Sequence, residues 1–474
     1  MEKVKKNYVY TIAYQILTIG IPLIITPYIS RTLGADNVGI YSYSYSITQY
    51  FMLFAMLGIS DHGNRIIAGK RDSKEELSKS FWSIYRIQLC ASVSAVLIFI
   101  VFIIFSENNN KEVLSVTLFF ILSALLDINW FFWGIENFKL TVTRNFFIKI
   151  LSLIAIFLFV KGREDLLLYT VIMSVSALVS NMCLWFFLIK EVSIVHIRWQ
   201  DCLKHLKPCI ILFIPLVARS VFVYMDKIML GQMSTMTQTG FYDYSEKIIL
   251  MPTSLLTSLG TVMLPRVSYM KEQRKDSEIL KVINKSMFFV IMCGCAFTFG
   301  IAAVAEDLAP IFLGSEYYDC GKIMELMSVT ILLVAWTNVI RTHYLIPCRK
   351  DSVFVIAVVL GAITNFFVNY CFIPKYGAIG AVYGWLAAEV VITLYQTIFS
   401  YHALPIKHYL NYLLIFMGLG MLMYIIVKYV QKKMDCTISV LILEIMVGIG
   451  VYLIGCMLLY LIKTIIQKLN QIKK

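Results

Sequence analysis

The stretch that decides the fold is IPLIITPYISRTLGADNVGIYSYS, residues 21–44, because much of it recurs as IPLVARSVFVYMDKIMLGQMSTMTQTGFYDYS, residues 214–245. Both copies begin with IPL, contain a Leu-Gly pair and end in the pattern G-[IF]-Y-x-Y-S. The second copy is longer, which an inserted loop explains. The first copy begins in the first apolar run and the second in the seventh, and this even offset of six means that both copies run in the same direction. The repeat predicts two lobes related by an axis along the membrane normal, an architecture found in transporters.

Apolar runs extend along the whole 474-residue chain. A helix needs ~20 apolar residues to cross the hydrocarbon core of a bilayer. Fourteen runs fit that length: 9–30, 41–60, 81–105, 113–133, 146–160, 166–189, 208–230, 241–264, 287–305, 323–346, 354–373, 378–401, 409–427 and 438–462. We therefore predict an all-α polytopic membrane protein with about 14 transmembrane helices. Six-helix lobes occupy 1–207 and 208–407, and an additional helix pair with a cytoplasmic tail occupies 408–474.

Composition and charge exclude several classes of protein. Hydrophobic residues make up 59% of the chain and charged residues 15%, against ~45–50% and ~25% in soluble domains. The net charge of +13 would suggest nucleic-acid binding in a soluble protein. With the N-terminus in the cytoplasm, however, 28 of the 42 Lys and Arg residues lie in cytoplasmic segments and nine in outer loops. This bias predicts that both termini are cytoplasmic and that the charge faces the lipid bilayer, with no nucleic acid as partner.

Catalytic and cofactor signatures are absent from the sequence. No G-x-x-x-x-G-K-[ST] phosphate loop occurs, so the chain is not expected to hydrolyse ATP itself. The six histidines show no metal-ligand spacing, and we predict no metal site. No outer loop is long enough for a catalytic domain. We therefore expect a protein that is not an enzyme and binds no cofactor apart from a coupling ion, H⁺ or Na⁺.

Four segments carry a family resemblance. RTLGADNVGIY (31–41) and LDINWFFWGIENF (126–138), the latter followed by Arg144-Asn145 and Lys149, resemble stretches of the polysaccharide flippases of the Wzx type. VMLPR (262–266) resembles the end of their eighth helix, and IPKYGAIGA (373–381) is typical of them. The resemblance spans about residues 5 to 400, and the order and spacing of the segments make it specific.

The resemblance implies membership in the superfamily that also holds multidrug extruders and lipid II flippases, which move amphiphiles by alternating access. It implies a flippase that moves undecaprenyl-diphosphate-linked oligosaccharide repeat units from the inner to the outer leaflet of the bacterial cytoplasmic membrane. Such units supply surface polysaccharide such as O-antigen or capsule. A polysaccharide polymerase is then an expected partner.

Intramembrane arginines are the candidate substrate-binding residues. A charged side chain at the bilayer centre costs several kcal/mol of free energy, so such a residue is expected to have a binding function or a partner. Arg219 lies at mid-depth of its run, Arg86 in the inner part and Arg341 toward the inner end. Arginine binds phosphate oxygens in a planar fork, which suits a diphosphate-linked cargo. The alternative is structural ion pairing, Arg86 with Asp127 and Arg219 with Glu389.

Acidic and amide residues are the candidates for ion coupling. Glu389 and Asp127 are intramembrane carboxyls that could exchange a proton. In lipid II flippases an Asp on the seventh helix and a pair four residues apart on the eleventh hold sodium. The resemblance places Asp226, Asn365 and Asn369 at those positions, although Asn369 stands where the family has a second carboxylate. The alternative for the two asparagines is an amide network between helices.

Two other functions remain open at the level of sequence. A multidrug or cation antiporter of the same fold should favour a cavity rich in carboxylates, whereas this chain offers arginines. A membrane glycosyltransferase or polymerase should carry an acidic catalytic loop on the outer side, and no such loop is present.

Overall fold

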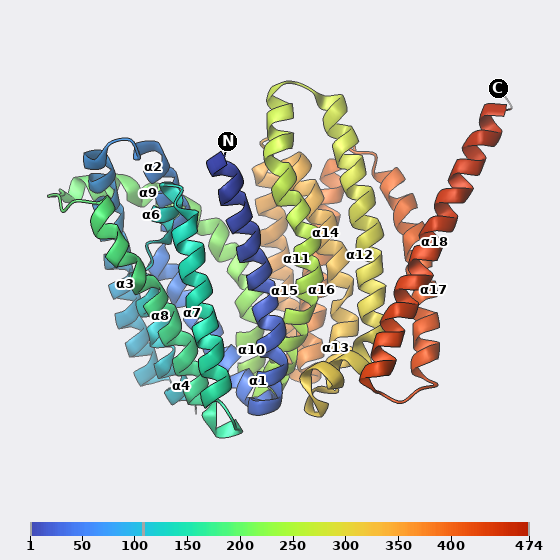
Figure 1. The fold of residues 1–474 in the computed structure, drawn as a ribbon, viewed down its shortest axis with the longest axis horizontal. Helices are drawn as coiled ribbons and strands as arrows, with labels where there is room; N and C mark the ends of the chain where they lie inside the picture. The colour runs from blue at the N-terminus through green and yellow to red at the C-terminus, as the bar shows by residue number, and fades with distance from the viewer. Residues whose placement is uncertain (1, 107–109, 473–474) are drawn as a thin grey trace. The chain divides into compact units, whose positions relative to one another are not determined.

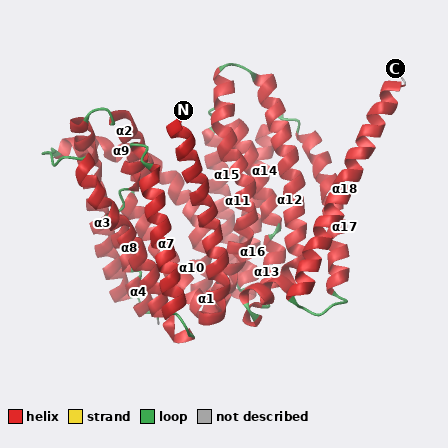
Figure 2. Cartoon of the chain, viewed as in Figure 1, coloured by secondary structure: helices red, strands yellow, loops and turns green. Residues whose placement is uncertain are grey.

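The computed structural model describes residues 2–106 and 110–472. The chain divides into two compact units, Met1–Gly240 and Phe241–Lys474, which are called unit 1 and unit 2 below and are described separately. The described residues form helices joined by short connections and contain no β-strand, as Figure 2 shows by colour. The helices of unit 1 appear in blue to green in Figure 1 and those of unit 2 in green to red.

The predicted fold class is confirmed. Eleven helices in the described part of the chain are long and apolar enough to cross a membrane. The first two predicted segments lie in one long helix, α1, and the seventh is divided into three pieces. Neither is among the eleven, so the number fourteen remains approximate. The chain is a multi-pass membrane protein built from helices alone in residues 2–106 and 110–472.

Unit 1 contains the first ten helices, two short helical turns and the start of α11. Its elements are α1 (Glu2–Met56), α2 (Ile59–Lys70), α3 (Lys74–Phe105), α4 (Lys111–Val116), α5 (Leu118–Leu125), α6 (Asn129–Gly134), α7 (Phe138–Phe159), η1 (Arg163–Asp165), α8 (Leu166–Glu191), α9 (Trp199–Ser220), η2 (Val221–Met225) and α10 (Asp226–Met233). The pieces of the seventh predicted segment pack in this unit, α9 against α2 and α3, and α10 against α1. The boundary predicted at 207/208 describes a repeat, and it stays a prediction.

The expected loop between segments 9–30 and 41–60 is wrong. Two helices follow each other within α1 and meet at Gly34, whose φ of 79° and ψ of 169° are not helical. Only glycine adopts this conformation without steric cost. The Leu-Gly pair of the first repeat copy is therefore the bend between two helices. A sharp bend inside one element replaces the expected loop.

The terminal glycines of the two repeat copies pack directly against each other's helix. A Cβ placed on Gly39 would lie 1.7 Å from the carbonyl oxygen of Met236, and one placed on Gly240 would lie 2.1 Å from that of Ala35. The backbones of α1 and the start of α11 therefore touch, as small residues allow at membrane helix crossings. Gly231 of the second Leu-Gly pair lies against the side chain of Tyr43, since a Cβ placed on Gly231 would lie 2.2 Å from that ring.

Two histidines join α2 to α9, ahead of the apolar run 208–230. Nε2 of His62 lies 2.9 Å from Nδ1 of His205, and His62 is 3% exposed. Burial lowers the pKa of His205 to about 4, helped by the charge of the neighbouring His62. Burial and the positive charge of Arg65 also lower the pKa of His62. The folded protein therefore favours the state in which both imidazole rings are neutral and a single hydrogen lies between Nε2 of His62 and Nδ1 of His205.

This pair predicts acid sensitivity. Because the folded-state pKa values lie below the ordinary value of 6.5, stability is complete above pH 6.5 and is lost as pH falls toward 4. The loss is on the order of 2 kcal/mol, since one pKa unit corresponds to about 1.4 kcal/mol and the site is partly exposed. Thermal unfolding of the protein in detergent at pH 7 and pH 4.5 measures it. His205→Gln should reduce the acid-induced drop, whereas the control His196→Gln, at an exposed position, should leave it unchanged. Equal drops in all three proteins would contradict this prediction.

Unit 2 contains the remaining helices. Its elements are most of α11 (Met236–Glu272), α12 (Asp276–Leu313), η3 (Ser315–Tyr317), α13 (Cys320–Met327), α14 (Val329–Ile340), η4 (Arg341–Leu345), α15 (Asp351–Tyr376), α16 (Ala378–Ser400), α17 (Ile406–Gln431) and α18 (Ile438–Ile472). The additional pair α17 and α18 packs on α12, where Gly420 abuts the ring of Phe299 and the Tyr452 hydroxyl donates to the carbonyl of Met292 at 2.7 Å. The predicted additional helix pair is thus packed against α12 of this unit.

Helices α15 and α16 form a close antiparallel pair built on small residues. A Cβ on Gly380 would lie 2.5 Å from the carbonyl of Phe372, and one on Gly384 would lie 1.9 Å from Oδ1 of Asn369. The missing side chains of these two glycines therefore allow the close packing of α15 and α16.

Candidate functional site: polar groups within the membrane helices

At a break between two helices of unit 1, backbone carbonyl groups accept hydrogen bonds from side chains. The break lies between α5 and α6, at residues 126–128. Nε2 of Gln88 donates to the carbonyls of Ala124 and Asp127, both at 2.8 Å, and the indole of Trp185 donates to the carbonyl of Leu126 at 3.0 Å. Within a bilayer every backbone polar group needs such a partner. The break within the predicted segment 113–133 is therefore stabilised by side-chain hydrogen bonds.

A buried network surrounds the carboxylate of Asp127. Its Oδ1 accepts from the backbone and side-chain nitrogens of Asn129, at 2.9 and 2.6 Å. Nη2 of Arg144 donates to the side-chain oxygens of Asn129 and Asn145, at 3.0 and 2.6 Å. Asn181 from α8 accepts from Asn129 at 3.3 Å. Arg144 is 9% exposed and interacts electrostatically with Asp127. This arrangement holds the buried guanidinium of Arg144 close to the half-buried carboxylate of Asp127, the anionic partner that a buried cation requires.

Arg86 does not complete that network. Its Nη1 donates to the carbonyl of Ile197 at 3.1 Å, and its guanidinium carbon lies 5.3 Å from the ring centroid of Trp199. The alternative pairing of Arg86 with Asp127 is therefore wrong, because Arg144 is the cation beside that carboxylate. Arg86 fastens the connection between α8 and α9, and its substrate-binding role stays a prediction.

The seventh helix is interrupted by one π-helical turn, η2, which separates Arg219 from Asp226. Such turns within α-helices frequently mark functional positions. Arg219 lies near the end of α9, and its side chain is outside the described residues. Asp226 begins α10 and is 1% exposed. Tyr50 of α1 donates to the carbonyl of Ser220 at 3.4 Å and interacts electrostatically with Asp226.

Asn365 and Asn369 form a buried pair in unit 2. Both are 0% exposed, and Nδ2 of Asn369 donates to Oδ1 of Asn365 at 3.2 Å. The pair packs on α16 at Gly384. This hydrogen bond lies within α15, so the alternative of an amide network between helices also stays a prediction. Asp226 belongs to unit 1, and a shared ion site with the two asparagines stays a prediction.

The last two candidates of unit 2 lie on different helices. Arg341 begins the π-helical turn η4, and its guanidinium carbon lies 5.3 Å from the ring centroid of Phe354. With the Asn338 amide turned to satisfy its neighbours, Nη2 of Arg341 donates to the amide oxygen at 2.9 Å. Glu389 on α16 is half-buried and hydrogen bonds with the indole of Trp385. Their roles in cargo binding and coupling stay predictions.

Sequence reasoning missed the importance of Arg144. It counted Arg144 as a cation of the cytoplasmic segment 134–149, whereas α7 already begins at Phe138 and contains it. The available signal was its place in one of the segments that carry the family resemblance. In the part of the chain that the structure describes, no group of three or more His, Cys, Asp or Glu side chains could hold a metal ion.

Comparison with known proteins identifies the family. A family model described as "Polysaccharide biosynthesis protein" matches residues 4–271, more than half of the chain. A Shigella dysenteriae protein named "Putative O-antigen transporter" is 21% identical over 379 residues, which cover 79% of this chain and 94% of that protein. An Escherichia coli K12 protein of the same name is 21% identical over 399 residues, 83% of this chain and 96% of its own length.

Solved structures show the same fold. The lipid II flippase MurJ in an inward closed conformation aligns with a TM-score of 0.77 and 18% identity, covering 96% of this chain and 99% of that one. An inward-facing multidrug transporter of the MATE family aligns with a TM-score of 0.60 and 11% identity, covering 78% and 93%. The resemblance seen in the sequence is thereby confirmed. The chain therefore belongs to the family described as "Polysaccharide biosynthesis protein".

Proposed function

We propose that this protein moves undecaprenyl-diphosphate-linked oligosaccharide repeat units from the inner to the outer leaflet of the bacterial cytoplasmic membrane, by alternating access. The observation that carries the proposal is similarity along nearly the whole length of two proteins named as O-antigen transporters. The fold shared with a lipid II flippase supports it, because lipid II is also a lipid-linked saccharide. Arginines within the helices suit a cargo whose diphosphate carries fixed negative charge. A polysaccharide polymerase that uses the exported units is a partner in the same proposal.

The proposal includes an orientation, with both termini in the cytoplasm. It is supported by the 28-to-9 distribution of Lys and Arg between the two sides. Ser73 caps the N-terminus of α3 in the exposed connection between α2 and α3. A cysteine at position 73 in a cysteine-free background should resist an impermeant thiol reagent added to intact cells and react after lysis. Ready labelling of intact cells would reverse the orientation.

Because the sequence contains no ATP-binding phosphate loop, transport is proposed to draw on an ion gradient or on the gradient of the cargo itself. Two carboxyls are the candidates for coupling. Glu389 is proposed as a proton carrier, and Asp226, with Asn365 and Asn369, as a site for sodium, since hard cations prefer oxygen ligands. Asp127 is the weaker candidate, because it is engaged with Asn129 and Arg144.

Transport of a fluorescent lipid-linked oligosaccharide in proteoliposomes tests the function and the coupling together. Proton coupling predicts transport that is driven by a pH gradient and lost in Glu389→Gln. Sodium coupling predicts dependence on a sodium gradient and loss in Asp226→Asn. Equal transport without any gradient, in the wild type and both variants, would contradict coupling. Absence of oligosaccharide transport together with gradient-driven efflux of an organic cation would replace the proposed function with that of a multidrug antiporter.

A further inference from the structure

The polar network around Asp127 leaves two hydrogen-bonding atoms open. Oδ1 of Asp127 accepts from Asn129, and Oδ1 of Asn145 accepts from Arg144 at 2.6 Å and from the Ser180 hydroxyl at 3.3 Å. Among the residues that the structure describes, none donates to Oδ2 of Asp127 and none accepts from Nδ2 of Asn145. Both side chains are half-buried, and neither of the two atoms is fully enclosed. The network therefore presents one acceptor and one donor on a surface that is called the polar surface of unit 1 below.

Side chains from three helices hold these two atoms in place. Nη2 of Arg144 on α7 donates to the side-chain oxygens of both Asn129 and Asn145. Asn181 of α8 accepts from Asn129 of α6 at 3.3 Å, and its own amide nitrogen donates to the carbonyl of Ser123 at 2.9 Å. A ligand on this surface meets groups whose positions are fixed before it binds, which lowers the entropic cost of binding and favours selectivity.

The polar surface of unit 1 lies within membrane-spanning helices. Asn145 belongs to α7 and Asn181 to α8, and both helices are long and apolar enough to cross a membrane. Their neighbours Phe147 and Val179 are 64% and 40% exposed, as apolar residues in contact with lipid are. Polar groups within a bilayer are buried in protein or line an aqueous path. Half-buried amides and a half-buried carboxylate at this depth therefore indicate an aqueous path beside α7 and α8.

Sugar hydroxyls match the two open atoms better than phosphate oxygens do. A hydroxyl both donates and accepts, so two neighbouring hydroxyls can satisfy the open acceptor and the open donor together. The oxygens of an ionised phosphate only accept, and they would lie against the negative charge of Asp127. Arg144 does not offset this repulsion, because its charge is balanced by Asp127 and its Nη2 donates to two amide oxygens. A neutral polyhydroxyl ligand is thus favoured over an anion.

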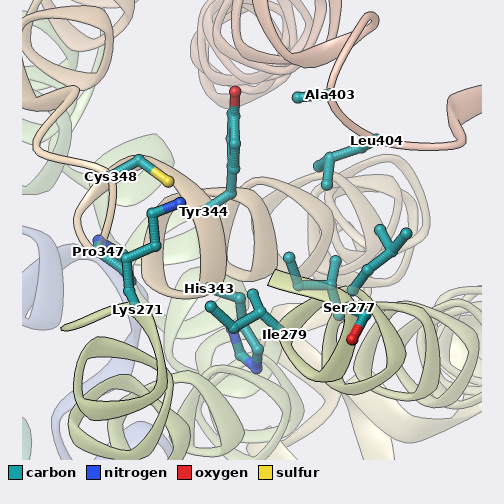
Figure 3. Close-up of a pocket in the computed structure, with 11 residues that line it drawn as sticks. Lys271, Ser277, Ile279, His343, Tyr344, Pro347, Cys348, Ala403 and Leu404 are labelled. Carbon is teal, nitrogen blue, oxygen red and sulfur yellow. The ribbon is translucent and has the colours of Figure 1, made fainter. Parts of the chain in front are cut away.

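A cavity of about 400 Å³ in unit 2 differs from this surface. Its wall contains Lys271, His343 and Tyr344, which Figure 3 labels. Lys271 already interacts with another group of the protein, and His343 is 0% exposed. The Tyr344 hydroxyl accepts from Nζ of Lys350 at 2.6 Å. These polar groups of the cavity are engaged or buried, whereas the polar surface of unit 1 keeps open atoms.

We propose that the polar surface of unit 1 binds the saccharide of the lipid-linked cargo. One sugar hydroxyl donates to Oδ2 of Asp127, and a neighbouring hydroxyl accepts from Nδ2 of Asn145. The inference rests on the proposed function, because it assigns one part of the same cargo to this surface. Asn129, Arg144 and Asn181 are then positioning residues, which hold the two contacting side chains in their orientations.

Two adjacent cysteines test whether the surface is open to water. Ser180→Cys replaces the hydroxyl that donates to Asn145, and Val179→Cys places a thiol on the lipid-exposed side of the same helix. Each variant is made in a cysteine-free background, and the full-length protein in nanodiscs is treated with a quaternary-ammonium methanethiosulfonate. The thiol at position 180 should react at least about tenfold faster than the thiol at 179, because a charged reagent is excluded from hydrocarbon. Equal rates, or no reaction at position 180, would contradict the inference.

Protection of the same thiol at position 180 reports binding of the saccharide. Two probes are compared: undecaprenyl diphosphate alone, and undecaprenyl diphosphate carrying the oligosaccharide, extracted from the bacterium that encodes this protein. We expect the lipid with the oligosaccharide to slow the reaction about tenfold at a concentration that fills roughly nine sites in ten. Undecaprenyl diphosphate alone should leave the rate unchanged, because it lacks the hydroxyls.

Isosteric variants of the same protein test the two contacts. Asp127→Asn keeps one oxygen for the network and replaces the open acceptor with a donor. Asn145→Asp keeps the oxygen that accepts from Arg144 and removes the open donor. Each should weaken binding of the oligosaccharide-bearing lipid about tenfold, as expected for one hydrogen bond lost in a site of fixed groups. Ser152→Ala is the matched control on α7, since its hydroxyl donates to the Lys149 carbonyl of its own helix at 2.9 Å. It should bind normally, and size-exclusion chromatography confirms that each variant is folded.

Three results of the protection experiment would overturn the inference: no protection by either lipid, equal protection by both lipids, or equal protection in the two isosteric variants and in Ser152→Ala. Binding is measured without transport, so these failures are distinct from failure of the proposed function. A protein that moves the oligosaccharide but leaves position 180 unprotected contradicts only this inference. A protein that is protected but moves none contradicts only the proposed function.

Discussion

Replacing Gly39 by alanine is expected to prevent unit 1 from folding normally. The new Cβ would lie 1.7 Å from the Met236 carbonyl oxygen, where ordinary contacts begin at 3.4 Å. The obstacle is a backbone atom, so no side-chain rotation can relieve it. The two helices would have to separate by more than 1 Å over their crossing, with loss of the packing around it. We expect a loss of at least about 4 kcal/mol in stability, which is exceptional for one methyl group. Fluorescence-detected size-exclusion chromatography and the thermal midpoint in detergent measure it.

Two further variants make this result specific. Gly240→Ala should show a comparable loss, since its Cβ would lie 2.1 Å from the Ala35 carbonyl. Gly69→Ala is the matched control, because nothing lies within 4 Å of that position on α2. Alanine there should be neutral or should stabilise by up to ~1 kcal/mol, as for glycine in an ordinary helix. A Gly39→Ala protein that elutes and melts like the wild type would disprove the close crossing of α1 and α11.

Replacing Arg219 by alanine is expected to abolish export of surface polysaccharide while the amount of protein stays normal. The residue lies in the middle of the repeat-bearing seventh apolar segment, two residues before the π-helical turn η2 begins at Val221. A cation retained at such a position needs an anionic partner, and the proposed cargo supplies a diphosphate. Arg219→Lys should restore only part of the export, since lysine keeps the charge but lacks the planar fork. Surface polysaccharide per cell, normalised to protein in the membrane, is the measurement.

Lys204→Ala provides the control for this variant. Lys204 lies on the same helix, α9, but its side chain is 71% exposed and forms an ion pair with Asp201 at 2.9 Å. Exposed pairs contribute ~0–1 kcal/mol, so the control should export normally. If Arg219→Ala exports as well as Lys204→Ala does, Arg219 does not contact the cargo.

Much of the fold was predictable because apolar length and glycine placement are properties of single segments. The runs 166–189, 354–373 and 378–401 coincide closely with α8, α15 and α16. Bilayer thickness alone sets their length. Helix ends were less predictable, since α11 and α12 extend beyond the apolar core into polar residues at 272 and 276. Outside the membrane a helix can continue through polar residues, so the hydrophobicity of the sequence does not indicate where the helix ends.

For the candidate site, too, one part was predictable from the sequence and another only from the structure. The sequence by itself determined which residues are costly to place in a membrane, and hence the choice of Arg86, Arg219, Asp127 and Glu389, because the cost of burying a charge belongs to the residue type. Only the tertiary structure decided which groups meet. Arg144 lies beside Asp127 across the helix break, whereas Arg86 contacts the segment before α9. The pairing of His62 with His205, 143 residues apart, and the cavity at His343 likewise arise from helices distant in the chain. The physical reason is that a hydrogen bond or an ion pair depends on distances of about 3 Å between atoms, and packing of whole helices, rather than any local pattern, sets those distances.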